Sequence, residues 1–294
     1  MKIYDCIIVG SGIAGMSSAI YLKRANKDIL LLESYIPGGQ INNTSNVENY
    51  PGFTKIDGPT LVMNLHDQIN SMEIPLKYEK VININKEDSF IVETNKEKYL
   101  TRNVILATGR NPNKLGIEDE FVGKGVSYCA LCDGNLYKNE EVVVVGGGNS
   151  AFEESLYLSK ICKKVTILNR SNKLKASMIL QEEVSKQNNI DVIYNCSIEK
   201  INSKNNKIVS VTTNKGDINC TGIFIYIGLT PNIDYINLDL EKENNYIVVD
   251  NKMQTNIKGI YACGDIIKKD VYQIITAASE GAIAATSIIR SMER

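Results

Sequence analysis

The chain has little of what several classes of protein need. Its net charge is −1 over 294 residues, so no strong attraction to nucleic acid is expected. No apolar run approaches the roughly 20 residues that span a membrane. No proline-rich or low-complexity linker interrupts the sequence. The apolar stretch at 3–9 is soon broken by glycines, so a buried strand is expected there, not a signal peptide.

Cysteine and histidine are too few, and too widely spaced, for a secreted disulfide scaffold or a zinc site. The seven cysteines are odd in number and irregularly spaced, which argues against a secreted disulfide scaffold and favours a reducing cytoplasm. His66 is the single histidine, and only one close cysteine pair exists, so half of a zinc site is missing. No metal site is predicted. Cys6 and Cys263 lie in apolar strands and are expected to be core residues.

That one close pair stands in the stretch Cys129-Ala130-Leu131-Cys132-Asp133-Gly134. A Cys-x-x-Cys pair can close a small disulfide ring or open to two thiols. Such pairs have depressed thiol pKa values, so one sulfur can attack another disulfide as a thiolate near neutral pH. The stretch therefore predicts thiol redox chemistry.

A glycine-rich turn follows the first apolar segment. A buried strand is predicted at 3–9, a helix after the glycine-rich turn that runs to about residue 24, and a second strand at 29–32 that ends at Glu33. In Gly10-Ser11-Gly12-Ile13-Ala14-Gly15 the first glycine permits a tight turn, the second admits a pyrophosphate, and the third allows close helix packing. The helix N–H groups would face the phosphates, and the acid could accept hydrogen bonds from ribose hydroxyls. The unit predicts a dinucleotide site.

The same unit recurs in the middle of the chain. A purely apolar strand at 142–145 precedes Gly146-Gly147-Gly148-Asn149-Ser150-Ala151, and a helix and a strand follow up to residue 168. This internal duplication predicts an α/β fold with two Rossmann-like dinucleotide-binding domains of the three-layer ββα type.

Alternating apolar and polar residues follow each of these units and predict small antiparallel sheets. In the first half the strands are expected at 77–84, 90–94 and 99–106, and residues 191–226 repeat the pattern. A last strand ends in Gly-Asp at 264–265, before a helix rich in small residues. This last segment resembles the strand and glycine turn of the first half.

With these motifs assembled, the chain resembles the low-molecular-weight bacterial thioredoxin reductases over nearly its whole length. The dithiol just before the second glycine-rich turn is the most specific part, because related flavoproteins that reduce lipoamide or glutathione disulfides carry their cysteines in the first domain. The other motifs that carry the resemblance, besides the two glycine-rich turns, are Gly38-Gly39-Gln40, Glu48-Asn49-Tyr50-Pro51-Gly52, Ala107-Thr108-Gly109 and Ala262-Cys263-Gly264-Asp265.

The resemblance implies a discontinuous FAD domain, 1–112 and 241–294, with a second domain, 113–240, inserted into it. The inserted domain would be NAD(P)H-like and carry the cysteine pair, and the protein would form a homodimer. The residues that would hold FAD are Gly10, Ser11, Gly12, Ile13, Ala14, Gly15, Glu33, Gly39, Gln40, Asn49, Gly264, Asp265 and Gln273.

The resemblance also implies the order of electron transfer, from reduced flavin to the Cys129–Cys132 disulfide and then to thioredoxin. Cys132 resembles the flavin-facing sulfur. Cys129 resembles the sulfur that attacks the substrate through a mixed disulfide. Asp133 would be the general acid that protonates the departing thiolate.

The second nucleotide site departs from the family pattern. NADPH enzymes clamp the 2′-phosphate with His-Arg-Arg-x-x-x-Arg, whereas residues 169–175 read Asn-Arg-Ser-Asn-Lys-Leu-Lys. Lysine and serine cannot reproduce the bidentate contacts of arginine, and losing two of them costs roughly a hundredfold in affinity. An NADH enzyme would place an acid at 168–172, where none stands. The remaining candidate contacts are Gly146, Gly148, Asn149, Ser150, Ala151, Arg170 and Lys175.

The electron donor is therefore open at this point. In its degraded clamp the chain is similar to the ferredoxin-dependent flavin thioredoxin reductases of clostridia. This similarity favours ferredoxin as the electron donor. NADPH, bound by Arg170, Lys173 and Lys175, is second, and NADH is third. Two other classes compete: an FAD dithiol oxidase with oxygen as acceptor, and a non-enzymatic flavin redox sensor. The intact Cys-x-x-Cys-Asp argues against the sensor.

Overall fold

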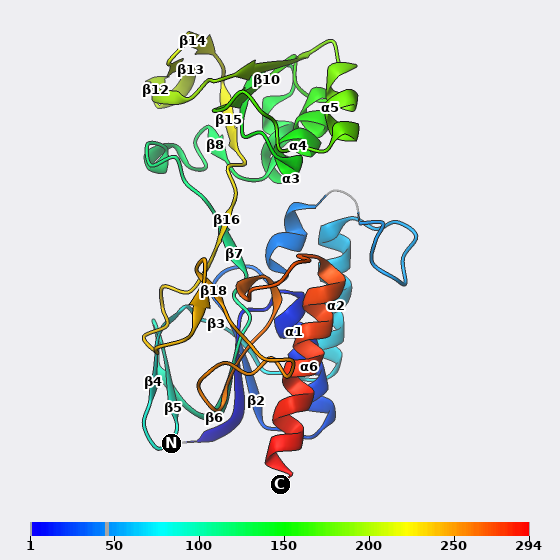
Figure 1. The fold of residues 1–294 in the computed structure, drawn as a ribbon, viewed down its shortest axis with the longest axis vertical. Helices are drawn as coiled ribbons and strands as arrows, with labels where there is room; N and C mark the ends of the chain where they lie inside the picture. Colours follow the sequence, from blue (N-terminus) through cyan, green and yellow to red (C-terminus); the bar gives the residue numbers. More distant parts are fainter. Residues whose placement is uncertain (1, 45–46, 294) are drawn as a thin grey trace. The chain divides into compact units, whose positions relative to one another are not determined.

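The computed structural model describes residues 2–44 and 47–293, and the chain divides into two compact units (Figure 1). The first unit combines Met1–Asn111 with Thr230–Arg294, and the second is Pro112–Leu229. The chain crosses between them twice. The two crossing strands, β7 (Arg110–Pro112) and β16 (Leu229–Pro231), pair with each other.

The return to the first unit comes earlier than the boundary expected at residue 241. Ile236 and Leu240 are buried, and both belong to the core that contains Ile7 and Val9 of the first strand. These apolar side chains tie residues 230–240 to the first unit, and the sequence carries no sign of that packing.

The first unit is built on a seven-stranded mixed sheet in the order β3-β2-β1-β6-β5-β4, with β19 also paired to β6. The strands β1, β2, β3, β6 and β19 are parallel, and β5 is antiparallel to its neighbours β4 and β6. The bounds are β1 Ile3–Val9, β2 Ile29–Glu33, β3 Leu76–Tyr78, β4 Val81–Lys86, β5 Phe90–Thr94, β6 Lys98–Leu106 and β19 Ile260–Ala262.

One strand predicted at 77–84 is in fact two, β3 and β4. They separate at Glu79, which is buried and accepts hydrogen bonds from Thr94 Oγ1 at 2.7 Å and Tyr99 Oη at 2.9 Å. Because a buried carboxylate needs such partners, the chain turns there. The first piece then pairs in parallel with β2, so the prediction of a purely antiparallel strand is wrong for it.

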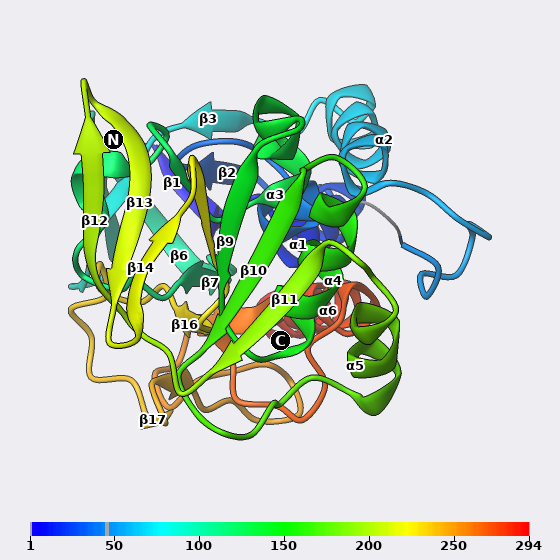
Figure 2. The same ribbon diagram turned by 90° about the horizontal axis from the view of Figure 1, so that it is seen from above.

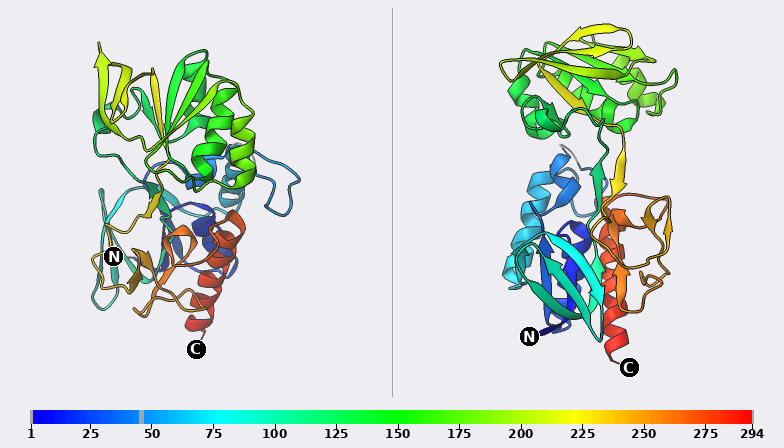
Figure 3. Two further views of the ribbon diagram at one scale, coloured as in Figure 1. Left: turned by 45° about the horizontal axis from the view of Figure 1, so that its top comes forward. Right: turned by 90° about the vertical axis from the view of Figure 1, so that its left-hand side faces the viewer.

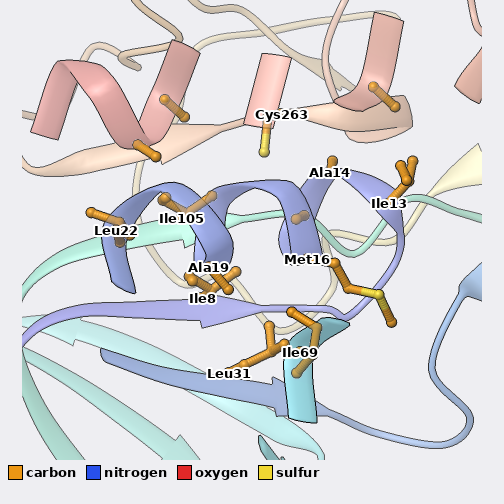
Figure 4. Packing of buried hydrophobic residues seen from close by; sticks show 14 of the residues in the cluster. Ile8, Ile13, Ala14, Met16, Ala19, Leu22, Leu31, Ile69, Ile105 and Cys263 are labelled. Carbon is orange, nitrogen blue, oxygen red and sulfur yellow. The ribbon is translucent and has the colours of Figure 1, made fainter. Parts of the chain in front are cut away.

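Three helices cover one face of this sheet: α1 (Ile13–Arg24), α2 (Gly58–Ser71) and α6 (Ile274–Met292). Figure 4 shows α1 between the strands that carry Ile8 and Leu31 and the segment that carries Cys263. The two helices α1 and α6 pack closely, because a Cβ on Gly281 would lie 2.1 Å from the carbonyl oxygen of Ala14. The small residues of α6 therefore serve helix packing.

The opposite face of the parallel strands forms a second core with the hairpin β4–β5, cyan in Figure 3, and with residues 233–267. Helices, parallel sheet and antiparallel strands make three layers. The remaining short elements of this unit are the 3-10 turns Gly39–Asn43 and Gly264–Ile266 and the hairpin β17 (Lys242–Glu243) and β18 (Tyr246–Ile247).

The second unit repeats this plan on a smaller scale (Figure 2). A parallel sheet has the order β11-β10-β9-β15-β8, and β12, β13 and β14 form a separate antiparallel sheet. The α/β fold with two Rossmann-like units is thus confirmed. The bounds are β8 Val126–Ser127, α3 Ala130–Asp133, β9 Glu141–Val145, α4 Asn149–Ser159, β10 Lys164–Asn169, α5 Met178–Ser185, β11 Ile190–Tyr194, β12 Ile198–Lys204, β13 Lys207–Thr213, β14 Gly216–Asn219 and β15 Gly222–Ile225, with 3-10 turns Asp119–Phe121 and Gly134–Tyr137.

The cysteines outside the close pair are free thiols buried in the cores of the two units, as expected for Cys6 and Cys263. Over residues 2–44 and 47–293, the helices lack the combination of length and apolar character needed to span a bilayer.

Candidate active site

Cys129 and Cys132 are joined by a disulfide with their Cα atoms 5.3 Å apart. Cys129 is the N-cap residue of the short helix α3, and its Sγ accepts a hydrogen bond from the Cys132 N–H at 3.0 Å. A donor at this distance stabilises negative charge on sulfur, so opening the disulfide favours the thiolate on Cys129. This geometry is compatible with the role of attacking sulfur that the resemblance implies for Cys129.

Neighbouring elements hold α3 firmly. The Cys129 N–H donates to Ser127 Oγ at 3.0 Å, and that hydroxyl donates back to the Cys129 carbonyl at 3.2 Å. Gly134, just after the helix, lies so close to α4 that an added Cβ would stand 3.1 Å from Leu158. The helix α3, which carries the cysteine pair, therefore packs against α4, the helix that begins at the second glycine-rich turn.

Asp133 is the last residue of α3 and is half-buried. Its N–H donates to the Cys129 carbonyl at 3.1 Å, which keeps its backbone next to the disulfide. Burial first, and the charge of Asp133 second, raise the pKa of the Tyr137 hydroxyl. The charge of Asp133 therefore acts on Tyr137, in the 3-10 turn that follows α3.

The first glycine-rich turn uses its three glycines in two ways. A Cβ on Gly10 would lie 2.5 Å from the Ala107 oxygen, and one on Gly15 would lie 1.9 Å from the Gly10 oxygen. These two positions must be glycine for the strand, turn and helix to pack. A Cβ on Gly12 meets nothing within 4 Å. The open space at Gly12, at the uncapped N-terminus of α1, is the cradle expected for a pyrophosphate.

Glu33 holds this turn in place. Its Oε2 accepts hydrogen bonds from the Ser11 N–H at 2.9 Å and the Ser11 hydroxyl at 2.8 Å, and Oε1 accepts from the Tyr35 N–H at 3.0 Å. The sequence predicts only a ribose contact for this acid. A carboxylate can accept about four hydrogen bonds, so both roles are compatible.

The structure brings several other predicted residues together. A Cβ on Gly39 would lie 3.9 Å from Gly12 Cα, so the second loop borders the first turn. Gln40 Nε2 donates to the Arg110 carbonyl at 3.2 Å. Asn49 Nδ2 donates to Gln273 Oε1 at 3.0 Å, although 224 positions separate them in the sequence.

Asp265 belongs to a chain of charges that the sequence does not reveal. Its two oxygens contact Arg110 Nη2 at 2.7 Å and Lys269 Nζ at 3.3 Å. Lys269 Nζ also lies 2.9 Å from Glu280, whose Oε2 accepts the Gly264 N–H at 2.8 Å. Burial, partly offset by Lys269, raises the pKa of Glu280. Two clues stand in the sequence: Arg110 directly follows the Ala-Thr-Gly turn, and Lys269 lies four residues after the acid.

Arg110 is also held against an aromatic ring. Its guanidinium carbon lies 4.4 Å from the centre of the Tyr272 ring. Among the described residues, its Nε is the one buried side-chain polar atom without a hydrogen-bond partner. A buried donor of this kind fits an acceptor supplied by a ligand.

Replacing Arg110 by methionine is expected to lower the free energy of unfolding by about 2 kcal/mol, because Asp265 loses a charged partner in a site with little solvent. Urea unfolding measures this. The matched control is Lys163→Met. Lys163 contacts Glu141 at the same 2.7 Å, but its side chain is 68% exposed against 17% for Arg110. The control should lose less than ~0.5 kcal/mol. Equal losses would contradict the burial argument.

The second glycine-rich turn has the same design as the first. A Cβ on Gly146 would lie 2.3 Å from the Tyr226 oxygen, and Ala151 is fully buried against the turn. A Cβ on Gly148 meets nothing within 4 Å. The open position of the turn is again its third residue, at the start of α4.

The segment after β10 folds back onto this turn. The Lys175 N–H donates to the Gly147 oxygen at 2.7 Å, and the Ser177 N–H donates to Asn149 Oδ1 at 2.8 Å. Asn169 is buried, and its Nδ2 donates to the carbonyl oxygens of Ser171 and Lys173. Asn169 therefore shapes the loop in place of a charged clamp. The cations on the same loop, Arg170, Lys173 and Lys175, are exposed.

Residues 4–281 match the family model described as pyridine nucleotide-disulphide oxidoreductase. A thioredoxin reductase of Bacillus subtilis is 40% identical over 302 residues, which is 99% of this chain and 96% of that protein.

Two solved structures extend the comparison. A thioredoxin reductase of Lactococcus lactis has a TM-score of 0.90 and 40% identity, covering 98% of both chains. A ferredoxin-flavin thioredoxin reductase of Clostridium acetobutylicum has a TM-score of 0.56 and 30% identity, covering 99% of this chain and 98% of that chain.

Proposed function

Because the chain belongs to the thioredoxin reductases of the pyridine nucleotide-disulphide oxidoreductase family, we propose that it reduces the disulfide of a thioredoxin with electrons that pass through bound FAD and the Cys129–Cys132 pair. The observation that carries the proposal is the closed disulfide whose Cys129 sulfur accepts the Cys132 N–H. Family membership does not favour the dithiol oxidase or the redox sensor.

The first unit fits FAD. The open cradle at Gly12 and the uncapped start of α1 suit its pyrophosphate, and the unpartnered Arg110 Nε lies beside Asp265 for a further acceptor. The chemistry that FAD supplies when bound is acceptance of a hydride and delivery of an electron pair to a disulfide. The residues that would hold it are Gly10, Ser11, Gly12, Ile13, Ala14, Gly15, Glu33, Gly39, Gln40, Asn49, Gly264, Asp265 and Gln273.

The reduced cysteine pair then carries out two exchanges. The Cys129 thiolate attacks one sulfur of the thioredoxin disulfide, and the other thioredoxin sulfur leaves and takes a proton. Cys132 next attacks the Cys129 sulfur, which re-forms the internal disulfide and releases the second thioredoxin thiol. Asp133 directly follows Cys132, and its N–H is bonded to the Cys129 carbonyl. In this proposal it supplies the proton for the departing thiolate.

For the donor we propose a reduced pyridine nucleotide, NADPH before NADH, bound at the second glycine-rich turn by Gly146, Gly148, Asn149, Ser150 and Ala151. Three exposed cations on the loop that closes on this turn support it. They replace the family's arginine cluster with weaker contacts, so a raised Kd for NADPH is expected. The ferredoxin preference that the sequence suggests is not supported, because identity is 40% to the Bacillus enzyme and 30% to the ferredoxin-flavin enzyme. As the resemblance implies, the assembly would be a homodimer.

Anaerobic stopped-flow with NADPH, NADH and reduced ferredoxin tests the donor. We expect NADPH to bleach the flavin fastest, and Arg170→Ala and Lys175→Ala each to raise its Kd about tenfold, since a charged contact contributes ~1.5 kcal/mol or more. Neither change should affect NADH. Lys186→Ala, an exposed lysine outside the loop, is the matched control. Fast bleaching by ferredoxin alone would overturn the proposal for the donor and leave the thioredoxin step untouched.

A further inference from the structure

Tyr226 makes a contact with the redox pair that no motif in the sequence announces. It follows β15 directly, and its hydroxyl oxygen accepts the Ala130 N–H at 2.8 Å. Ala130 lies between the two cysteines and is fully buried. Since a buried N–H without an acceptor costs about 1–3 kcal/mol, this bond is a substantial part of what fixes the first turn of α3.

The backbone of the same tyrosine borders the second glycine-rich turn. The Tyr226 N–H donates to the Val145 oxygen at 2.8 Å. A Cβ added to Gly146 would stand 2.3 Å from the main-chain carbonyl oxygen of Tyr226. One residue therefore contacts the disulfide helix through its side chain and the glycine-rich turn through its main chain.

We propose that Tyr226 is a positioning residue for the dithiol, which keeps the Cys132 N–H within reach of the Cys129 sulfur after the disulfide opens. While the disulfide is closed, the covalent ring itself holds these atoms together. In the open state non-covalent contacts must do so, and among them are those of Ser127 and Asp133 at Cys129 and that of Tyr226 at Ala130. The proposal rests on the proposed function, in which Cys129 acts as a thiolate.

The titratable groups whose charges act near α3 and Tyr226 lie on three elements. Asp133 lies on α3, Tyr137 on the 3-10 turn after it, and Glu154 on α4. Burial raises the pKa of Glu154 to about 7. Burial, and then the charge of Glu154, raise the pKa of Tyr226 well above its usual value, so its hydroxyl stays neutral throughout the physiological range. Removing that hydroxyl thus removes no charge from the site.

The test compares Tyr226→Phe with Tyr137→Phe, each in the reduced full-length protein. Tyr137 is a matched control because it loses a hydroxyl in the same region while its ring packs edge-on against Phe224 at 5.4 Å. The rate of Cys129 alkylation by iodoacetamide is followed against pH, with mass spectrometry to identify the modified peptide. At pH 7 we expect Tyr226→Phe to be three- to tenfold slower, with its pH profile moved to higher pH, and the control to match the unaltered chain.

A second measurement covers the case in which Tyr226→Phe lowers overall stability. The equilibrium of the disulfide with dithiothreitol should shift three- to tenfold toward the closed form, because the hydroxyl is needed most when the ring is open. A merely structural hydroxyl would destabilise both redox states equally and leave this equilibrium and the alkylation rate unchanged, which would overturn the proposal. If Cys129 of the unaltered chain showed no fast alkylation at all, the proposed function would be at fault instead.

Discussion

A Cys132→Ser variant, reduced and mixed with oxidised thioredoxin, should accumulate a covalent complex of the two proteins. Cys129 keeps its place and can still attack the thioredoxin disulfide, but no second thiol remains to resolve the mixed disulfide. Turnover should fall by more than about a thousandfold. Non-reducing electrophoresis and mass spectrometry of the linked peptides detect the complex.

The reciprocal variant, Cys129→Ser, is the control. It should form no complex, because the thiolate proposed to attack the thioredoxin disulfide belongs to Cys129, whose sulfur accepts the Cys132 N–H at 3.0 Å. Both variants should keep FAD, since neither cysteine lies in the first unit. A complex formed by Cys129→Ser and absent from Cys132→Ser would reverse the roles given to the two sulfurs.

Gly12→Val should give a folded protein that does not retain FAD. Its Cβ meets nothing within 4 Å and its φ of −68° suits any residue, so the first unit can form. The side chain would then fill the space proposed for the pyrophosphate. Losing two charge-assisted hydrogen bonds costs about 3–6 kcal/mol, which is more than a hundredfold in affinity. Titration of the apoprotein with FAD, followed by flavin fluorescence, measures it.

Gly15→Ala should instead destabilise the fold itself. One added methyl would stand 1.9 Å from the Gly10 oxygen, and backbone cannot easily move away. Overpacking of this kind costs about 3 kcal/mol, so the unfolding midpoint should fall even without FAD. If Gly12→Val bound FAD normally, or if it proved as unstable as Gly15→Ala, the assignment of the cradle would be wrong.

Local sequence patterns predicted much of the fold. The strand at 3–9, the helix that ends near residue 24 and both glycine-rich turns come out as predicted, because the hydrophobic period and turn chemistry act within a few residues. The strand predicted at 77–84 failed because the partners of buried Glu79 come from β5 and β6, beyond any local window. The unit boundary moved for the same reason: Ile236 and Leu240 join a core built from β1.

The sequence by itself determined that this protein carries two glycine-rich turns and one Cys-x-x-Cys pair, since each is a contiguous motif whose chemistry depends on neighbouring residues. Only the tertiary structure decided which atoms support them. Glu33 binds Ser11, Arg110 binds Asp265, and Tyr226 binds Ala130, across 22, 155 and 96 positions. Such partners are set by how helices and strands pack, and packing is a property of the folded chain.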